Sequence, residues 1–173
     1  MPSFNHSYIC AQLMRQFLLD ESLQPMPDLT LDIESGMSPD ISVFRKEEVK
    51  PDFFEDILKA KKAPVLAVEV MGLHQSIQEM LDSAKLLLKA WVKAVWIVEP
   101  YARSVFVLSG KEQRLFHQEL VETEGIRVDF AKVFFVERWR GTAVVSSGKQ
   151  LTSGQAAIMP PAVSSSAAGI LRH

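Results

Sequence analysis

The sequence has a single cysteine, Cys10, among its 173 residues, so no disulfide can form within the chain and a reducing compartment is favoured. It has no apolar run of the ~20 residues that a helix needs to cross a bilayer. Its first residues show neither the basic segment nor the apolar stretch of a signal peptide. We therefore expect a cytoplasmic protein that does not contact a membrane.

Acidic residues are absent after Glu137. Four cationic residues follow it, so this last segment carries +4 and residues 1–137 carry −6 of the formal net charge of −2. An acidic body disfavours strong non-specific DNA binding, which depends on neutralising phosphates, but a local basic groove is still allowed. Serine, alanine, glycine and proline dominate from about Gly141, a composition typical of flexible segments. We predict a folded domain at 1–137 and a flexible low-complexity tail at 138–173.

The rest of the chain contains helical and strand-like segments in a regular order. Apolar stripes at helical spacing predict helices over 5–21 and 76–91. Apolar runs predict strands at 29–33, 38–44, 65–70, 94–98, 104–108, 114–117 and 126–130, with a hairpin turn at Gly36 and a short helix at 53–60. The helix between the strands at 65–70 and 94–98 is a crossover, which makes those strands parallel. The order αβββαβ predicts an α/β fold with a mixed sheet flanked by helices.

Two acidic residues interrupt strands that otherwise look buried. Asp40 follows Pro39 at the start of one strand, and Glu69 lies within the apolar run of the next. A carboxylate in such a place is costly unless it is paired or binds a cation. Carboxylate oxygens are the ligands that Mg²⁺ prefers, and a bound metal polarises a phosphate ester and lowers the pKa of a bound water. Asp40 and Glu69 are therefore candidate ligands of one cation, although Asp40 could instead start a strand by accepting backbone N–H bonds.

These motifs, in this order and spacing, resemble the Uma-two family of predicted endonucleases, a branch of the PD-(D/E)XK superfamily. The resemblance covers roughly residues 4–135 and runs through Asn5-His6-Ser7, 38–44, 64–70 and 92–100. It implies a restriction-endonuclease-like fold and hydrolysis of DNA phosphodiester bonds with Mg²⁺ or Mn²⁺. It also implies that Asp40, Glu69 and the backbone carbonyl of Val70 are the metal ligands.

The lysine that serves the attacking water in this superfamily is missing from both expected places. Met71 follows two residues after Glu69, and Ser83 occupies the position of the family's lysine on the next helix. Leu87 replaces the tyrosine that follows that lysine in the family. Gln75, just past the Glu69 strand, is the remaining polar residue that we assign to the catalytic site, and His74 is a weaker candidate.

Helical geometry decides whether Lys85 can take the place of the missing lysine. The predicted buried face of the helix comprises Ile77, Met80, Leu81, Ala84, Leu88 and Trp91. Two positions along a helix differ by roughly 200° of rotation. If Ser83 flanks this face on one side, Lys85 flanks it on the other, and we expect Lys85 to point into solvent.

Three alternatives stay open from the residues alone. The chain is an active endonuclease, a catalytically degenerate nuclease fold that binds nucleic acid or protein, or a homodimer whose partner supplies the missing base. Outside the carboxylate pair, we assign His6 to helix capping or packing and Cys10 to the core. No serine–histidine–aspartate set or second cysteine suggests covalent catalysis.

Overall fold

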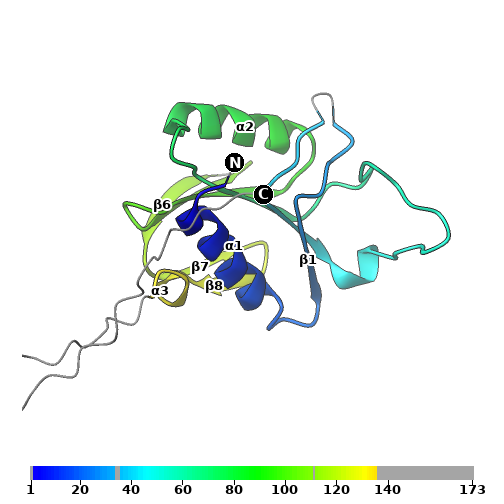
Figure 1. Ribbon diagram of the computed structural model, residues 1–173, viewed down its shortest axis with the longest axis horizontal. Coiled ribbons are helices and arrows are strands. Elements are labelled where there is room, and N and C mark those ends of the chain that lie inside the picture. Colours follow the sequence, from blue (N-terminus) through cyan, green and yellow to red (C-terminus); the bar gives the residue numbers. More distant parts are fainter. Residues whose placement is uncertain (1, 34–35, 111, 136–173) are drawn as a thin grey trace, which may run out of the picture. The chain divides into compact units, whose positions relative to one another are not determined.

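The computed structural model of the protein describes residues 2–33, 36–110 and 112–135. They belong to the compact unit Met1–Glu137, whereas the predicted tail at 138–173 lies outside the described residues. The elements are α1 (Phe4–Phe17), β1 (Leu23–Pro27), β2 (Ile41–Arg45), η1 (Lys46–Glu48), β3 (Leu66–Val70), α2 (Ile77–Lys89), β4 (Ala94–Glu99), β5 (Ser104–Ser109), β6 (Gln113–His117), β7 (Leu120–Thr123), β8 (Ile126–Asp129) and α3 (Phe130–Val133) (Figure 1). The predicted αβββαβ order is confirmed.

The main sheet has six strands in the order β1-β2-β3-β4-β5-β6. β3 and β4 are parallel and are joined by α2, as the crossover predicts, while every other neighbouring pair is antiparallel. The α/β fold with a mixed sheet is therefore confirmed. β7 and β8 form a separate antiparallel hairpin.

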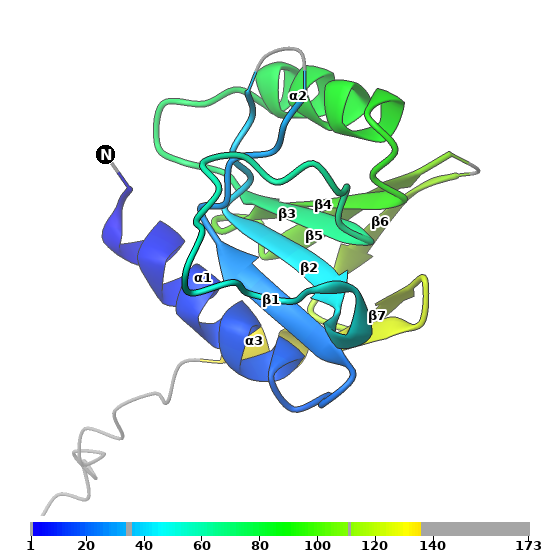
Figure 2. The ribbon, with the colours of Figure 1, turned by 90° about the vertical axis from the view of Figure 1, so that its right-hand side faces the viewer.

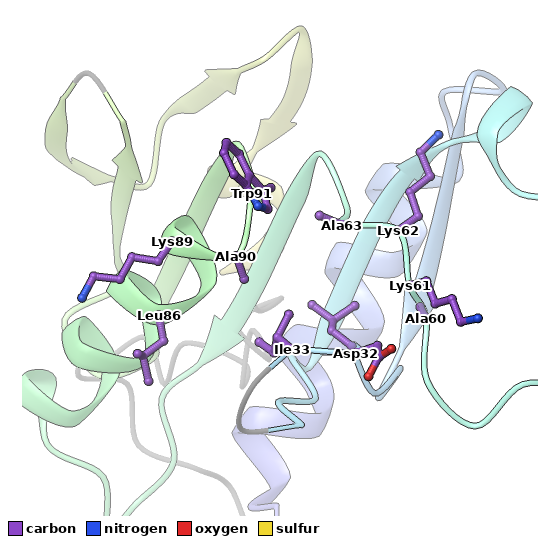
Figure 3. Close-up of a pocket in the computed structure, with 11 residues that line it drawn as sticks. Asp32, Ile33, Ala60, Lys61, Lys62, Ala63, Leu86, Lys89, Ala90 and Trp91 are labelled. Carbon is purple, nitrogen blue, oxygen red and sulfur yellow. The ribbon is translucent and has the colours of Figure 1, made fainter.

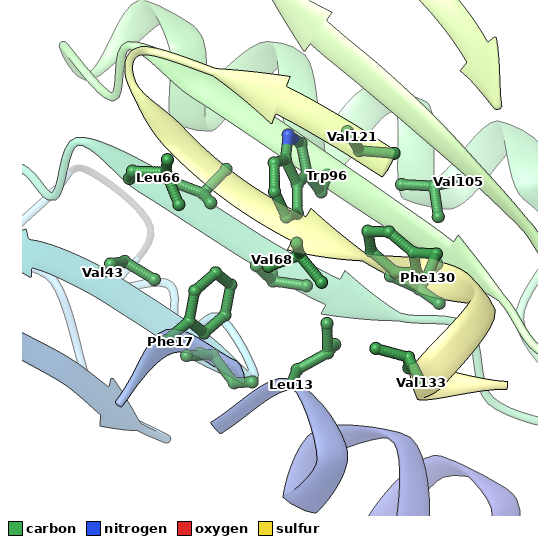
Figure 4. Packing of buried hydrophobic residues seen from close by; sticks show 14 of the residues in the cluster. Leu13, Phe17, Val43, Leu66, Val68, Trp96, Val105, Val121, Phe130 and Val133 are labelled. Atoms are coloured by element: carbon green, nitrogen blue, oxygen red, sulfur yellow. The ribbon is translucent and has the colours of Figure 1, made fainter. Parts of the chain in front are cut away.

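Each face of the main sheet buries its own apolar cluster. Leu13 and Phe17 of α1 pack with Val68 and Trp96 on one face, which the β7–β8 hairpin and α3 also cover (Figure 4). Met80, Ala84 and Leu87 of α2 pack on the opposite face. Figure 2 shows α1 and α2 on the two sides of the sheet. Burial of these side chains is the main source of stability and fixes α1 against the sheet.

Local capping explains where the two long helices begin. Ser3 caps α1 by accepting a hydrogen bond from the backbone N–H of His6. α2 begins with a capping box in which Ser76 and Glu79 each satisfy the backbone N–H of the other. In the described part of the chain, neither these nor any other helix is long and apolar enough to cross a membrane.

The first strand was predicted in the wrong place. It spans Leu23–Pro27, while the 29–33 segment is a loop in which Leu31 makes only an isolated bridge to Ala60. Pro25 and Pro27 obscure the strand in the sequence, but prolines are tolerated because β1 is an edge strand of the sheet. Leu31 is nevertheless buried, because the loop covers the face on which α2 lies.

The helix predicted at 53–60 is also absent. Asp52 accepts a hydrogen bond from the backbone N–H of Phe54, and Asp56 accepts one from that of Ile57. Such short side-chain-to-backbone bonds offer the backbone an alternative to helical hydrogen bonds. Phe53 and Phe54 point into solvent, so this segment has no apolar face to hold a helix against the domain.

The buried face of α2 differs from the predicted one at both ends of the helix. Ile77, predicted to be buried, is exposed at the N-terminal end. Leu87 is fully buried and Leu88 only partly, whereas Trp91 is 86% exposed. Trp91 follows the end of the helix and has a φ of 71°, so the helical periodicity does not extend to it. The face is therefore centred on Met80, Ala84 and Leu87.

Candidate metal-binding site

The antiparallel register of β2 and β3 places the two predicted carboxylates at one end of the sheet. Ile41 lies opposite Val68, so Asp40 and Glu69 occupy the next opposite positions. Side chains at such positions share a face and lie close together. The neighbourhood that the sequence predicts for Asp40 and Glu69 is thus produced by strand pairing.

Asp40 is held from two directions. Its Oδ2 accepts a 2.6 Å hydrogen bond from the backbone N–H of Val70 at the end of β3. Its Oδ1 lies 3.0 Å from Nε2 of His6, which α1 brings to the edge of the sheet. The side chains of His6 and Asp40 are only 15% and 20% exposed. One carboxylate therefore connects β2, β3 and α1.

Glu69 is in an environment that disfavours its negative charge. Burial, and then the neighbouring Asp40 carboxylate, raise the pKa of Glu69 to about 8, against the opposing effect of a hydrogen bond from the Asp40 backbone. In the part of the chain that the structure describes, no lysine or arginine forms an ion pair with either carboxylate. Two adjacent carboxylates with so little compensating positive charge have the donor chemistry of a divalent-cation site.

Cys10 adjoins this pair. Its Sγ lies 3.9 Å from Nδ1 of His6, one helical turn earlier. Burial, followed by the charges of Asp40 and Asp28, raises the pKa of the Cys10 thiol to about 12. Cys10, His6 and Asp40 are arranged in space like a nucleophile, its general base and the acid that orients the base. A nucleophilic cysteine, however, needs a lowered pKa. The surroundings of Cys10 act in the opposite direction, so this cluster is not a thiol-nucleophile site.

Among the described residues, no hydrogen bond or ion pair joins the other two predicted catalytic residues, Gln75 and Ser83, to the carboxylates. Gln75 uses its Oε1 to accept the backbone N–H of Gly72, which closes the turn after β3. Ser83 is half-buried on α2, and among the described residues no hydrogen bond joins it to Asp40 or Glu69. The roles of Gln75, Ser83 and the Val70 carbonyl therefore stay predictions.

Lys85 lies where the helical argument puts it. Its side chain is 55% exposed, and its Nζ is paired at 2.9 Å with Oδ1 of Asp82 on the same helix. Lys85 therefore does not take the place of the missing lysine.

His6, Cys10 and Asp28 are the neighbours that the sequence interpretation missed. His6 was assigned to capping or packing, but its ring contacts Asp40, 34 positions away. Cys10 does pack against the core, as predicted, yet it also contacts His6. The available signal was the spacing of His6 and Cys10, which puts two metal-ligand side chains on one face of a helix.

A hollow elsewhere on the domain does not share this site. It has a volume of about 450 Å³ and lies between the 31–33 and 60–63 segments and the C-terminal end of α2. Its rim carries Lys61, Lys62 and Lys89, whose side chains point in different directions (Figure 3). These cations do not converge on a common point, and neither Asp40 nor Glu69 lines the hollow.

Comparison with known families decides which group this carboxylate site belongs to. The model of the Uma2 family, described as "Putative restriction endonuclease", matches residues 1–132. The chain belongs to the Uma2 family. The resemblance seen in the sequence is thereby confirmed, and the match includes the segments that carry Asp40 and Glu69. None of the curated proteins matches this Uma2 sequence.

A solved structure shares the fold of this Uma2 chain. It is the crystal structure of a "putative nuclease belonging to DUF820" from Anabaena variabilis ATCC 29413, with a TM-score of 0.67 and 20% sequence identity. The match covers 78% of this chain and 82% of that one. A weaker likeness, with a TM-score of 0.39 and 12% identity, is to a cryo-EM structure of a DrdV–DNA complex and covers 69% of this chain and 10% of that one. The first match supports the nuclease fold, and the second is too distant to support an argument.

Proposed function

We propose that this Uma2 protein is a metal-dependent endonuclease that hydrolyses phosphodiester bonds of DNA. The proposed metal is Mg²⁺ or Mn²⁺, and the proposed ligands are Asp40, Glu69 and the backbone carbonyl of Val70. Family membership supports nuclease chemistry. The observation that carries the proposal is the buried position of Glu69 beside Asp40, which raises the pKa of Glu69 to about 8.

The residues at the site suit a divalent cation. Both carboxylates offer oxygen, the donor that Mg²⁺ and Mn²⁺ prefer. A divalent cation there would polarise the scissile phosphate and generate a nucleophilic water. The Val70 N–H fixes the Asp40 carboxylate, and the His6 ring contacts its other oxygen, so the carboxylate is oriented before a ligand arrives.

The second candidate function is a degenerate nuclease fold that binds nucleic acid or a protein without cutting. Met71 and Ser83 at the two lysine positions favour it, as does the pairing of Lys85 with Asp82. A lysine in this superfamily serves the attacking water, so its loss removes a contribution to catalysis while leaving the metal ligands in place. A homodimer in which the partner chain supplies the missing base would reconcile the two functions, and sedimentation of the active protein tests it.

Cleavage of supercoiled plasmid DNA in the presence of Mg²⁺ or Mn²⁺ separates these functions. The endonuclease proposal expects nicked and linear products from the full chain, none with a chelator, and none from Asp40→Ala. Glu122→Ala is the matched control, because it removes an exposed carboxylate that is paired with Arg127 in the β7–β8 hairpin. DNA binding without cleavage under any metal would favour the degenerate fold.

The single cysteine fits a reducing compartment. We therefore place the proposed nuclease in the cytoplasm, where its DNA substrate would also be found. Fractionation of cells expressing the untagged chain tests this location.

A further inference from the structure

A second set of metal-ligand side chains shares Asp40 with the proposed nuclease site. His6 and Cys10 lie four residues apart on α1 and therefore face the same way, the spacing by which one helix offers two ligands to one ion. Ligand atoms of His6, Cys10 and Asp40 all lie within 4.8 Å of one another. Ligands of a tetrahedral zinc ion are separated by roughly 3.5 Å, so the three groups lie near the spacing that one ion requires.

We propose that His6, Cys10 and Asp40 bind a first-row transition-metal ion of the zinc or cobalt type. Imidazole nitrogen and thiolate sulfur are ligands that such ions prefer, whereas Mg²⁺ prefers oxygen. The inference rests on the proposed function only in that Asp40 faces a cation. The site inferred here has a nitrogen and a sulfur ligand. It therefore differs from the proposed nuclease site at Asp40, Glu69 and Val70, which has oxygen ligands alone.

The scaffold around the three side chains is that of an oriented metal site. Leu13 and Phe17, further along the same helical stripe, are fully buried and hold α1 on the sheet. The Val70 N–H binds Oδ2 of Asp40 and leaves Oδ1 facing His6. A backbone donor that fixes a ligating carboxylate is a common supporting contact at metal sites.

The charges around the cluster also favour a cation. Asp28 adds negative charge near Cys10, in addition to Asp40. Across residues 2–33, 36–110 and 112–135, Asp40 pairs with no lysine or arginine. A bound cation would offset these charges, and coordination would release the thiol proton to solvent as the metal–sulfur bond forms.

Cobalt binding gives a direct test because the chain has one cysteine. The reduced, metal-free full chain is titrated with Co²⁺ while absorption is recorded. The proposal expects one equivalent of Co²⁺ to produce a near-ultraviolet thiolate-to-cobalt charge-transfer band, which Zn²⁺ abolishes and millimolar Mg²⁺ does not. Absence of this band from folded wild-type protein would overturn the proposal without recourse to any variant.

Variants then assign the ligands. Cys10→Ser is expected to remove the band, and His6→Ala to weaken Co²⁺ binding by at least about tenfold. His117→Ala is the matched control, since His117 is exposed on β6 outside the cluster, and it should bind like the wild type. Circular dichroism of each variant checks that it is folded. Equal Co²⁺ affinity in folded His6→Ala and His117→Ala would remove His6 from the site.

Glu69→Gln distinguishes failure of this inference from failure of the proposed function. The variant should lose DNA cleavage and keep the cobalt band, because Glu69 is not one of the three ligands. Cleavage by the wild type with Mg²⁺, but no cobalt band, would contradict the inference and leave the nuclease proposal intact. A cobalt band without DNA cleavage under any metal would contradict the nuclease proposal and leave the inference intact.

Discussion

The backbone N–H of Val70 donates a 2.6 Å hydrogen bond to Oδ2 of Asp40, which joins the end of β3 to the start of β2. This contact means that Asp40 does more than start a strand, since the same carboxylate also faces His6 on α1. It gives the site a fixed orientation in the absence of any ligand. The predictions that follow test the cation, the missing lysine and the helix that supplies His6.

Returning a lysine to Ser83 should increase DNA cleavage. By the family resemblance, Ser83 is the position of the lysine that serves the attacking water. Groups of this kind contribute typically about 100-fold or more to rate, so Ser83→Lys should raise metal-dependent plasmid cleavage by up to about that factor. Leu86→Lys, on an exposed position of the same helix, is the control and should change little. Equal rates for the two variants would show that position 83 does not face the site.

The raised pKa of Glu69 should make the metal-free protein less stable as pH rises. Because its pKa is about 8 in the folded state and 4.5 ordinarily, the native state binds more protons between these values. The free energy of unfolding should therefore fall from about pH 4.5 to about pH 8, by no more than about 1.4 kcal/mol per pH unit. The Asp40 carboxylate acts on Glu69, and Glu69 acts in turn on the Cys10 thiol, which titrates well above this range.

Urea unfolding in the presence of a chelator measures this dependence. Glu69→Gln should show a shallower decline than the wild type over the same range. If both proteins lose stability equally between pH 5 and pH 8, another group is responsible and the environment assigned to Glu69 is wrong.

Removing Leu13 should loosen the helix that carries His6 and Cys10. Leu13 is fully buried against the sheet, so Leu13→Ala should lower the free energy of unfolding by about 2–5 kcal/mol through lost burial and a cavity. Leu19→Ala is the matched control, because Leu19 is 74% exposed, and its effect should stay within about 0.5 kcal/mol. Denaturant melts of the two variants give the comparison, and similar values would contradict the assigned role of α1.

The sequence predicted the parts of the fold in which local pattern and tertiary structure agree. The apolar runs at β2 to β5 and the periodicity of α1 and α2 appear as expected. β1 escaped prediction because its prolines are tolerated only at a sheet edge, and an edge is a property of the whole sheet. β7 was missed because it is a four-residue strand with one buried side chain, Val121, which is too little for a period to be recognised.

Some residues of the candidate site could likewise be predicted from the sequence, and others could not. Asp40 and Glu69 could be found because each interrupts an apolar run, and strand pairing then places them together. The contact of His6 with Asp40 could not be predicted, because it depends on how α1 packs on the sheet. Asp28 likewise reaches the cluster through the loop after β1, where its backbone N–H binds the Asp40 carbonyl at 3.2 Å.

Thermal unfolding with and without Mn²⁺ tests the central claim, that Asp40 is a ligand of a divalent cation. A ligand present at 100 times its dissociation constant stabilises the folded state by about 2.7 kcal/mol. The wild type should therefore melt at a higher temperature in Mn²⁺. Asp40→Asn keeps an acceptor for the Val70 N–H, so it should fold, yet show no such rise. An equal rise in both proteins, or none in the wild type, would contradict the account.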